Sequence, residues 1–146
     1  MVELLDAYAA GRSGGGKPLS EDVKQRLAPG VRAQPGALVL LAFVASAPVG
    51  VVTCFPGFST FYARPLLNVH DLAVLEAYRR RGIGRALLGA VERHARARGC
   101  CKMTLEVLRD NEGARRLYDE YGFRDLELGG TTHETLFLSK PLPAKE

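Results

Sequence analysis

Residues 72–88, LAVLEAYRRRGIGRALL, combine the expected end of a β-strand, a basic glycine loop and the start of a long helix. The apolar residues up to Val74 are typical of a buried strand, and the apolar stripe that begins at Ile83 has helical spacing. A helix N-terminus presents unpaired N–H groups and partial positive charge, while glycines let the backbone close on a phosphate. Three arginines precede Gly82 and add charge. The stretch therefore predicts a binding site for a pyrophosphate.

Other kinds of glycine loop fit this stretch less well. No Gly-Lys-Ser/Thr follows, so it is not a Walker A loop. A dinucleotide-binding fingerprint is matched only in part, because Leu87 stands where a third glycine or alanine belongs and residues 76–81 separate the strand from Gly82. Glu106, at the end of the next expected strand, is placed like the acid that binds a ribose in such proteins. The alternative function is that of a small nucleotide-binding oxidoreductase. The alternative without any ligand is a solvated basic turn whose glycines only start the helix.

Hydrophobic periodicity predicts four helices along the chain. The long helix after the glycine loop carries an apolar stripe of Ile83, Leu87, Val91 and His94. Residues 11–18 are rich in glycine and are expected to be flexible. Capping residues, glycines and one proline mark the helix bounds: Ser20 and either Asp110 or Asn111 at the starts, and Gly11, Pro29 with Gly30, Gly99 and Gly122 at the ends.

Between the helices the sequence predicts β-strands, the first two as a hairpin. They are expected at residues 37–45, 49–57, 66–75, 101–108, 123–129 and 133–142, with an irregular connection over 58–65. The fold class is thus α/β (α+β), with a single mixed sheet flanked by helices. With 146 residues, the chain is expected to form one domain, residues 1–146.

Composition narrows the class of protein further. Hydrophobic residues make up 47% and charged residues 25%, which predicts a packed core. No apolar run of about 18 residues and no secretory signal pattern is present, so we expect a cytoplasmic protein without a membrane partner. The net charge of +4 is concentrated near the glycine loop, which favours a compact phosphorylated ligand over nucleic acid. The three cysteines lack metal-ligand spacing, and no metal site is expected.

Two motifs resemble one known family. The pattern R-x-x-G-x-G between a strand and a helix is the acetyl-CoA motif of the GCN5-related N-acetyltransferase (GNAT) superfamily. About thirty residues later, members carry N-x-x-A-x-x-L-Y-x-x-x-G-F, and this chain has matching residues there: Asn111, Ala114, Leu117, Tyr118, Gly122 and Phe123. The resemblance covers roughly residues 38–140. It implies the GNAT acyl-CoA N-acyltransferase fold, with a mostly antiparallel sheet, and acetyl-CoA as co-substrate.

The start of the chain departs from this family's pattern. GNAT chains usually begin with a strand before the first helix, whereas this sequence begins inside that expected helix. The first strand is therefore apparently missing. The sheet edge that it would cover is expected to be exposed or to pair with another subunit, which leaves a homodimer open.

The resemblance implies which residues bind the co-substrate. Backbone N–H groups of the loop and the helix start would hold the pyrophosphate, at Arg79, Arg80, Arg81, Gly82, Ile83, Gly84, Arg85 and Ala86. The pantetheine arm would pair like an added strand with the third strand, at Leu72, Ala73 and Val74. From the other side Asn111, Ala114 and Arg115 are expected near the cofactor.

The resemblance also suggests the catalytic groups for direct acetyl transfer to a primary amine. An alkyl amine with a pKa of about 10 must lose a proton before it attacks, and the leaving thiolate needs one. Tyr118 stands at the family's tyrosine position and is expected to be the acid. Glu106 resembles the base of ribosomal-protein alanine acetyltransferases, and His70 resembles the histidine of serotonin acetyltransferases. Which of the two is the base stays open.

Alternation along the third strand places His70 on the same face as Leu72 and Val74. Asp71 would point to the opposite face unless a bulge intervenes. His133 and Glu134 are expected to line the acceptor mouth. The acceptor itself is open: a polyamine, an amino acid, an aminoglycoside-like compound or a protein N-terminus. A GNAT-fold module that binds acyl-CoA as a sensor, without turnover, is the alternative function.

Overall fold

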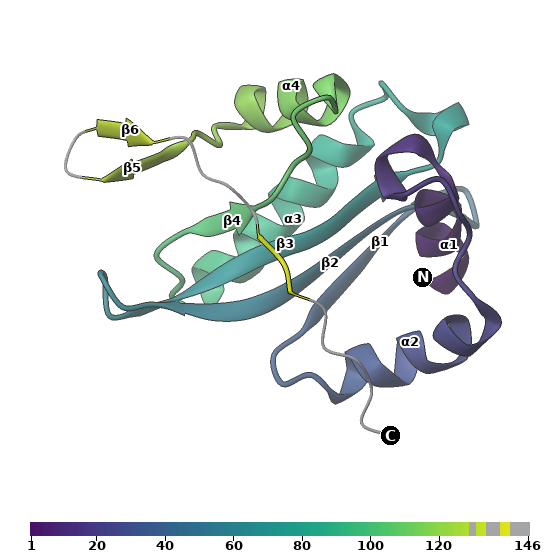
Figure 1. The fold of residues 1–146 in the computed structure, drawn as a ribbon, viewed down its shortest axis with the longest axis horizontal. Coiled ribbons are helices and arrows are strands. Elements are labelled where there is room, and N and C mark those ends of the chain that lie inside the picture. The colour runs from purple at the N-terminus through teal and green to yellow at the C-terminus, as the bar shows by residue number, and fades with distance from the viewer. Residues whose placement is uncertain (129–130, 134–137, 141–146) are drawn as a thin grey trace.

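The computed structural model describes residues 1–128, 131–133 and 138–140 of the chain (Figure 1). Its helices are α1 (Val2–Ala10), α2 (Glu21–Ala33), α3 (Ile83–Ala97) and α4 (Glu112–Tyr121). Its strands are β1 (Leu38–Val44), β2 (Ala47–Ser59), β3 (Arg64–Val74), β4 (Met103–Leu105), β5 (Leu126–Leu128) and β6 (Thr131–His133). Short 3₁₀ turns occupy Arg12–Gly14 and Glu76–Tyr78. The predicted order of helices and strands is confirmed, but β6 comes before the strand expected at 133–142, and most of that range lies outside the described residues.

The main sheet has four strands in the order β1-β2-β3-β4. The first three strands pair antiparallel, and β4 runs parallel to β3, so the predicted mixed and mostly antiparallel sheet is confirmed. We expected β5 and β6 in this same sheet. In the described residues they pair with each other as a separate two-stranded ribbon.

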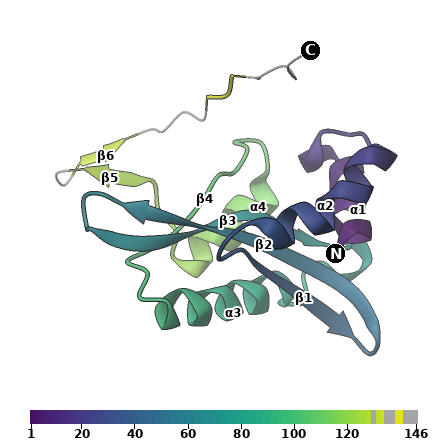
Figure 2. The same ribbon diagram turned by 90° about the horizontal axis from the view of Figure 1, so that it is seen from below.

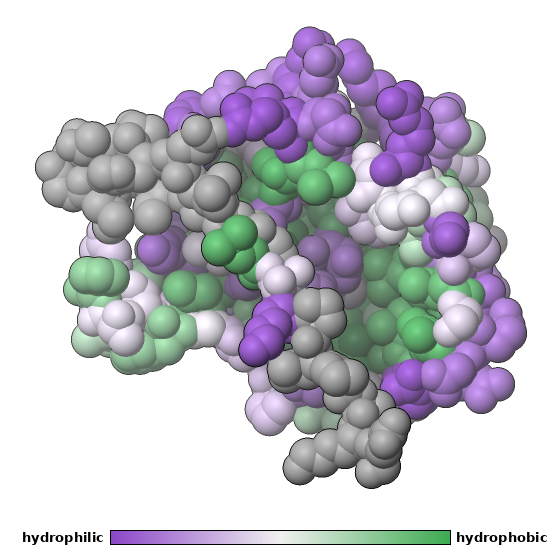
Figure 3. Space-filling view, viewed as in Figure 1, coloured by the Kyte–Doolittle hydropathy of each residue, from purple (hydrophilic) through white to green (hydrophobic). Residues whose placement is uncertain are grey.

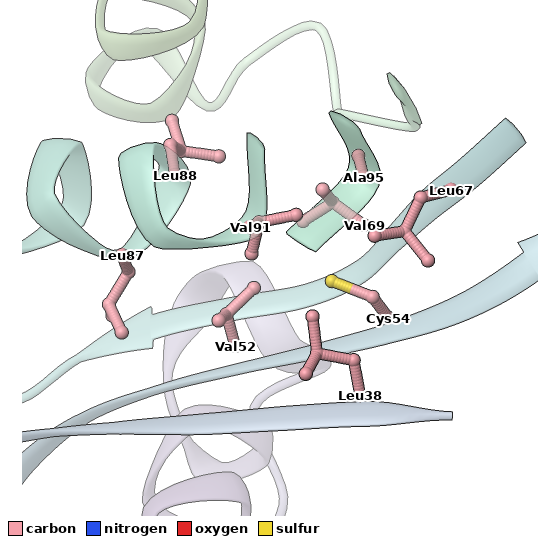
Figure 4. Packing of buried hydrophobic residues seen from close by; sticks show 9 residues of the cluster. All are labelled: Leu38, Val52, Cys54, Leu67, Val69, Leu87, Leu88, Val91 and Ala95. Carbon is pink, nitrogen blue, oxygen red and sulfur yellow. The ribbon is translucent and has the colours of Figure 1, made fainter. Parts of the chain in front are cut away.

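Helices cover both faces of the main sheet. Figure 2 shows α3 on one face and α1 with α2 on the other. The larger core lies under α3, where nine buried residues interlock (Figure 4): Leu38, Val52, Cys54, Leu67, Val69, Leu87, Leu88, Val91 and Ala95. A smaller cluster under α1 joins Leu4, Leu5, Val51 and Ala73. Alternate residues of β2 therefore face the two cores, as expected for a strand covered on both sides.

Capping residues start two helices as the sequence predicts. The Ser20 hydroxyl accepts a hydrogen bond from the Val23 N–H, and the Asn111 side chain accepts one from the Ala114 N–H at 3.2 Å. The prediction that Pro29 ends α2 is wrong, because the helix continues to Ala33. Proline removes one backbone hydrogen bond, and here the helix continues in spite of that loss.

Several loop and strand predictions also need correction. Gly14 is not part of a flexible linker, since a Cβ there would lie 2.0 Å from the Tyr8 carbonyl oxygen. The expected irregular connection over 58–65 is mostly hairpin, with pairing that continues to Ser59 and Arg64. The strand expected at 101–108 is reduced to β4. In α3, Leu88 and Ala95 are buried while His94 is exposed.

The outer edge of β1 has no strand beside it in the part of the chain that the structure describes. The longest helix is α3, with 15 residues, and among the described residues no helix is long and apolar enough to cross a membrane.

Candidate active site

The N-terminus of α3 is built differently from those of α2 and α4. Ser20 and Asn111 cap those helices, whereas no side chain caps α3. Arg80 and Gly82 both have left-handed backbone, with φ of 62° and 79°, and turn the chain into the helix. Because the first N–H groups of a helix have no intrahelical acceptor, this end offers free donors to an anion. The predicted pyrophosphate site is thus geometrically competent.

The loop before α3 is held to the end of β3 by its own hydrogen bonds. The Leu75 N–H donates to the Val49 carbonyl at 2.9 Å, and the Arg79 Nε donates to the Val74 carbonyl at 3.0 Å. The Arg79 N–H also donates to the Glu76 carbonyl. Arg79 therefore shapes the loop through both its backbone and its side chain.

The other arginines of the loop lie against tyrosine rings. The Arg81 guanidinium is 5.3 Å from the centre of the Tyr78 ring, and that of Arg85 is 5.7 Å from the centre of the Tyr121 ring. Arg81 and Arg85 are exposed. Cation–π contacts at these distances restrain the side chains while leaving the charge at the surface.

Two glycines allow α3 to pack closely at its first turn. A Cβ on Gly84 would lie 2.9 Å from Leu117 Cδ2 of α4. A Cβ on Gly50 of β2 would lie 3.2 Å from both Ile83 Cγ2 and Leu87 Cδ1. The glycine loop is thus anchored against β2 on one side and α4 on the other.

A gap opens between β3 and β4 next to this loop. Only Leu67–Val69 pairs with β4, so from residue 70 onward β3 has no strand on that side among the described residues (Figure 1). The predicted pantetheine residues Leu72, Ala73 and Val74 lie on this free edge. Beyond the gap, the Arg115 Nη1 donates to the Arg109 carbonyl at 3.1 Å, and Asn111 caps α4. A free strand edge can accept an extended ligand by main-chain hydrogen bonds.

Tyr118 lies on α4, half-buried, with its ring 5.8 Å from that of Phe123 in an edge-to-face contact. Burial, and after it the proximity of Tyr8, raises the pKa of Tyr118 to about 12. A phenol with this pKa keeps its proton at neutral pH. Tyr118 is therefore protonated at neutral pH, as a proton donor must be.

A β-bulge changes the predicted orientation of His70, just before the free edge. Val69 pairs with Cys54 and Asp71 pairs with Thr53, so His70 is the extra residue of β3. The prediction that His70 shares a face with Leu72 is wrong. Leu72 packs towards the core under α3, whereas the His70 ring contacts Phe55, 5.4 Å away in an edge-to-face arrangement on the other face.

Asp71 lies on the α1 face of the sheet, opposite Leu72, as alternation along β3 predicts. Its carboxylate accepts a hydrogen bond from the hydroxyl of Thr53, which is 1% exposed. Tyr8 of α1 lies nearby, and its pKa is raised by burial first and by the Asp71 charge second. Tyr8 and Thr53 were not predicted as site residues. The helical spacing of Tyr8 indicated only a core position, and no local signal marks Thr53.

Glu106 lies just after β4, exposed, at the apex of the gap. Both of its carboxylate oxygens lie 3.3 Å from the Asn68 Nδ2, which donates to them. The same amide donates to Thr104 Oγ1 at 3.1 Å. Because Val69 faces α3, alternation along β3 places Asn68, and with it Glu106, on the face of α1 and α2. The two candidate bases, Glu106 and His70, thus lie on the same face.

An apolar groove lies on this same face, next to Phe55. A cavity of about 500 Å³ lies between α2 and β2, and its lining includes Val23, Leu27, Val31 and Phe55. Figure 3 shows hydrophobic surface between α1 and α2 on this face. The side chain of His133 and the whole of Glu134, predicted at the acceptor mouth, lie outside the described residues.

The cysteines are free thiols. Burial raises the pKa of Cys54 to about 12, which makes a reactive thiolate unfavourable. Cys54 thus packs as a small apolar side chain in the core under α3.

Together the uncapped helix, the free strand edge and the tyrosine form one candidate site at the end of β3. The model of the Acetyltransferase (GNAT) family matches residues 3–123, and the chain belongs to this family. Membership of this family argues against the alternative that the protein is a small nucleotide-binding oxidoreductase.

Two curated proteins illustrate the range of its relatives. An uncharacterized N-acetyltransferase of Bacillus subtilis is 33% identical over 60 residues, which cover 41% of this chain and 38% of that protein. The L-ornithine N5-acetyltransferase of Arabidopsis thaliana is 31% identical over 90 residues, which cover 60% of this chain and 40% of that protein. The chain therefore matches less than half the length of these two relatives.

Solved structures share the fold over nearly the whole chain. The crystal structure of a probable acetyltransferase superposes with a TM-score of 0.77 and 24% identity, covering 96% of this chain and 91% of the other. At this identity the likeness shows the fold and not the substrate.

Proposed function

We propose that the protein transfers the acetyl group of acetyl-CoA directly to a primary amine of a small molecule or peptide. The observation that carries this proposal is the uncapped N-terminus of α3 directly beside the free edge of β3. The first feature suits a pyrophosphate and the second suits an extended, amide-containing arm. Acetyl-CoA contains both groups in series.

The cofactor-binding residues follow from these two features. Backbone N–H groups from Arg80 to Arg85 would hold the pyrophosphate, with the exposed arginines adding positive charge. The Ala86 N–H is not available, because it donates to the Gly82 carbonyl at 2.9 Å. Leu72, Ala73 and Val74 would pair with the arm, and a backbone N–H there would polarise the thioester carbonyl. The side chains of Arg79 and Asn111 would support the cofactor site indirectly. They hydrogen-bond the Val74 carbonyl and the Ala114 N–H respectively, and so are not free to bind the cofactor.

The proposed chemistry needs one proton taken from the ammonium before attack and one given to the thiolate that leaves. Glu106 or His70, both on the acceptor face, removes the first proton. The amine nitrogen then bonds to the thioester carbon, the C–S bond breaks, and Tyr118 donates its phenolic proton to the sulfur. The second nitrogen proton leaves to solvent or resets Tyr118, which balances the reaction.

One relative supports an alkyl amine as acceptor. The Arabidopsis protein is named for acetylation of the side-chain amine of ornithine, and it shares 31% identity with this chain over 90 residues. An ammonium group on a short alkyl chain fits a face with exposed carboxylate and imidazole groups.

The experiment is a titration with acetyl-CoA followed by thiol release in the presence of primary amines. Binding together with thiol release that depends on the amine supports an N-acetyltransferase. Binding without release from any amine would instead support the non-catalytic sensor.

A further inference from the structure

Asn68 joins β3 to β4 at the point where the two strands separate. Leu67–Val69 of β3 pairs with Met103–Leu105 of β4, and Asn68 lies opposite Thr104 in the middle of this register. The Asn68 amide donates to Thr104 Oγ1 at 3.1 Å and to both carboxylate oxygens of Glu106 at 3.3 Å. One side chain of β3 therefore holds two side chains on the opposite strand and just beyond it.

These contacts restrain the Glu106 carboxylate without blocking it. A primary amide has two N–H donors, so one serves the Thr104 hydroxyl and the other is shared by the two carboxylate oxygens. An ionised carboxylate has about four acceptor positions. Lone pairs of Glu106 thus stay available for a proton.

The two candidate bases occupy equivalent places but have different surroundings. Glu106 and His70 are each the first residue beyond the last pair, Val69 with Leu105. Glu106 is exposed, and a free glutamate side chain would sample many rotamers, which the bond from Asn68 limits. The His70 ring contacts Phe55, whose apolar ring supplies no hydrogen-bond acceptor atom to orient the imidazole.

We propose that Asn68 is a positioning residue that holds the Glu106 carboxylate at the mouth of the gap, and that Glu106 rather than His70 is therefore the base. This inference rests on the proposed function. The carboxylate takes a proton from the acceptor ammonium, the freed amine attacks the thioester, and the proton is later released to solvent. Asn68 acts through Glu106, because hydrogen-bonded supporting residues keep a catalytic group within the narrow geometry that proton transfer needs.

A purely structural role for Asn68 makes a different prediction. An amide that only ties β3 to β4 would, when removed, disturb the free edge of β3 and weaken acetyl-CoA binding. An amide that serves Glu106 would, when removed, lower kcat and leave acetyl-CoA affinity and the KM of the amine little changed. A double-mutant cycle separates the two roles, since residues that act as a unit have non-additive effects.

The experiment measures kcat for Asn68→Leu alone, with Glu106→Gln and with His70→Gln. Thiol release is followed with the best acceptor among L-ornithine, 1,4-diaminobutane and a peptide that begins with alanine. We expect Asn68→Leu to lower kcat by about ten-fold or more, because a small misplacement of a catalytic group costs this much. The loss should vanish in the Glu106→Gln background and persist in full in the His70→Gln background.

Variants of Thr104 test the same contact without changing Asn68. Thr104→Val removes the acceptor that fixes one amide N–H, and should lower kcat in part. Thr104→Ser keeps the hydroxyl and should keep the parent rate. Thr60→Val, at the exposed turn between β2 and β3, is the control for replacing threonine by valine and should leave kcat unchanged.

The outcomes distinguish this inference from the function on which it rests. Equal losses for Asn68→Leu in the two backgrounds, an unchanged kcat, or a loss confined to acetyl-CoA affinity would each overturn the positioning role and leave the transfer reaction standing. Binding of acetyl-CoA by the parent protein with no thiol release from any amine would contradict the transfer reaction, and the positioning role with it.

Discussion

The glycine loop follows the end of β3 and the acceptor face includes residues of the same strand, yet they are specified in different ways. The loop occupies one continuous stretch, residues 79–86, and its hydrogen bonds run between near neighbours in sequence, such as Arg79 with Val74. The acceptor face is assembled from residues far apart in the chain. Tyr8, Thr53, Asp71 and Glu106 come from α1, β2, β3 and the end of β4.

This difference teaches where each kind of specificity is encoded. A local stretch can be kept intact in many proteins and can bind one common co-substrate. A face built from distant elements changes whenever a helix or a bulge shifts, and so can be adapted to different acceptors. Changes in the loop should therefore affect acetyl-CoA binding, and changes on the face should affect the acceptor or the chemistry alone.

The largest expected effect is on the chemical step. Tyr118→Phe should lower kcat by about 100-fold or more, because general acid catalysis is worth this much. Acetyl-CoA affinity should stay the same, since the ring packing against Phe123 is kept. Pre-steady-state thiol release and calorimetry give the two numbers.

Tyr121→Phe on the same helix is the matched control for Tyr118→Phe. The Tyr121 hydroxyl donates to Glu92 at 2.7 Å, on the side of α3 and away from the free edge of β3. Its loss should leave kcat unchanged. A normal rate for Tyr118→Phe would remove that residue from the role of acid.

The two candidate bases can be separated by their pH profiles. Glu106→Gln and His70→Gln keep the size of each side chain and remove its ability to take a proton. The variant that lacks the base should lose about ten-fold or more in kcat and should also lose the acidic limb of the pH–rate profile. The other variant should keep both. Unchanged profiles in both variants would point to a water chain or to another residue as base.

A change in the glycine loop should weaken acetyl-CoA binding and lower stability, without a direct effect on the acceptor. Gly84→Val would place a Cβ 2.9 Å from Leu117 Cδ2, so the Leu117 side chain must shift and the packing of α3 on α4 is disturbed. We expect a loss of about 1–3 kcal/mol in the free energy of unfolding, as for other overpacked sites, and weaker acetyl-CoA binding. Chemical denaturation and calorimetry measure these effects.

Gly113→Val gives a matched control for Gly84→Val. Gly113 occupies the same position in α4 as Gly84 does in α3, and a Cβ there would meet nothing within 4 Å. It should cost less stability and leave acetyl-CoA affinity intact. Equal losses in the two variants would mean that valine in a first helical turn, and not the contact with Leu117, causes the effect.

The smallest expected effect concerns the attachment of α1, which carries Tyr8. The carboxylate of Asp6 accepts a hydrogen bond from the Leu19 N–H at 2.7 Å and pairs with Lys24 at 2.9 Å. Lys24 first, and Leu19 second, lower the pKa of Asp6 below its ordinary value. The ionised form is thus favoured in the folded state.

The sign of the pH effect follows from this lowered pKa. The contribution of Asp6 is complete above the pKa of the unfolded chain, about 3.9, and is lost as the pH falls through the lower pKa of the folded state. Asp6→Asn should therefore be slightly less stable than the parent at pH 7, and the difference should shrink below about pH 4. Thermal unfolding at several pH values checks this. A difference that is the same at pH 3 and pH 7 would contradict the ionic attachment.

The sequence predicts features with local signals, such as the glycine loop, better than features assembled from distant residues, such as the acceptor face. The glycine loop, the caps at Ser20 and Asn111 and the C-terminal glycine of α4 were predicted because their signals are local. The bulge at His70 could not be predicted, since it depends on the register between β2 and β3. Nor could the position of Tyr8, since its contacts with Val51 and Ala73 form only when α1 packs on the sheet.

Two predictions failed because the rest of the fold overrode a local signal. Pro29 is a strong local signal for a helix end, but the helix continues past it to Ala33. The apolar run 101–108 reads as a long strand, but only Met103–Leu105 finds a partner, because β3 and β4 diverge after Val69. This divergence creates the free edge on which the proposed function depends.

The most direct test of the central claim is calorimetric titration of the purified protein with acetyl-CoA, with NADH in a parallel cell. The uncapped α3 N-terminus and the free edge of β3 predict acetyl-CoA binding in the micromolar range and no signal with NADH. The Gly84→Val protein should bind acetyl-CoA more weakly, and Asp71→Asn should bind it like the parent. No binding of acetyl-CoA by the folded parent protein would contradict the assignment of this site.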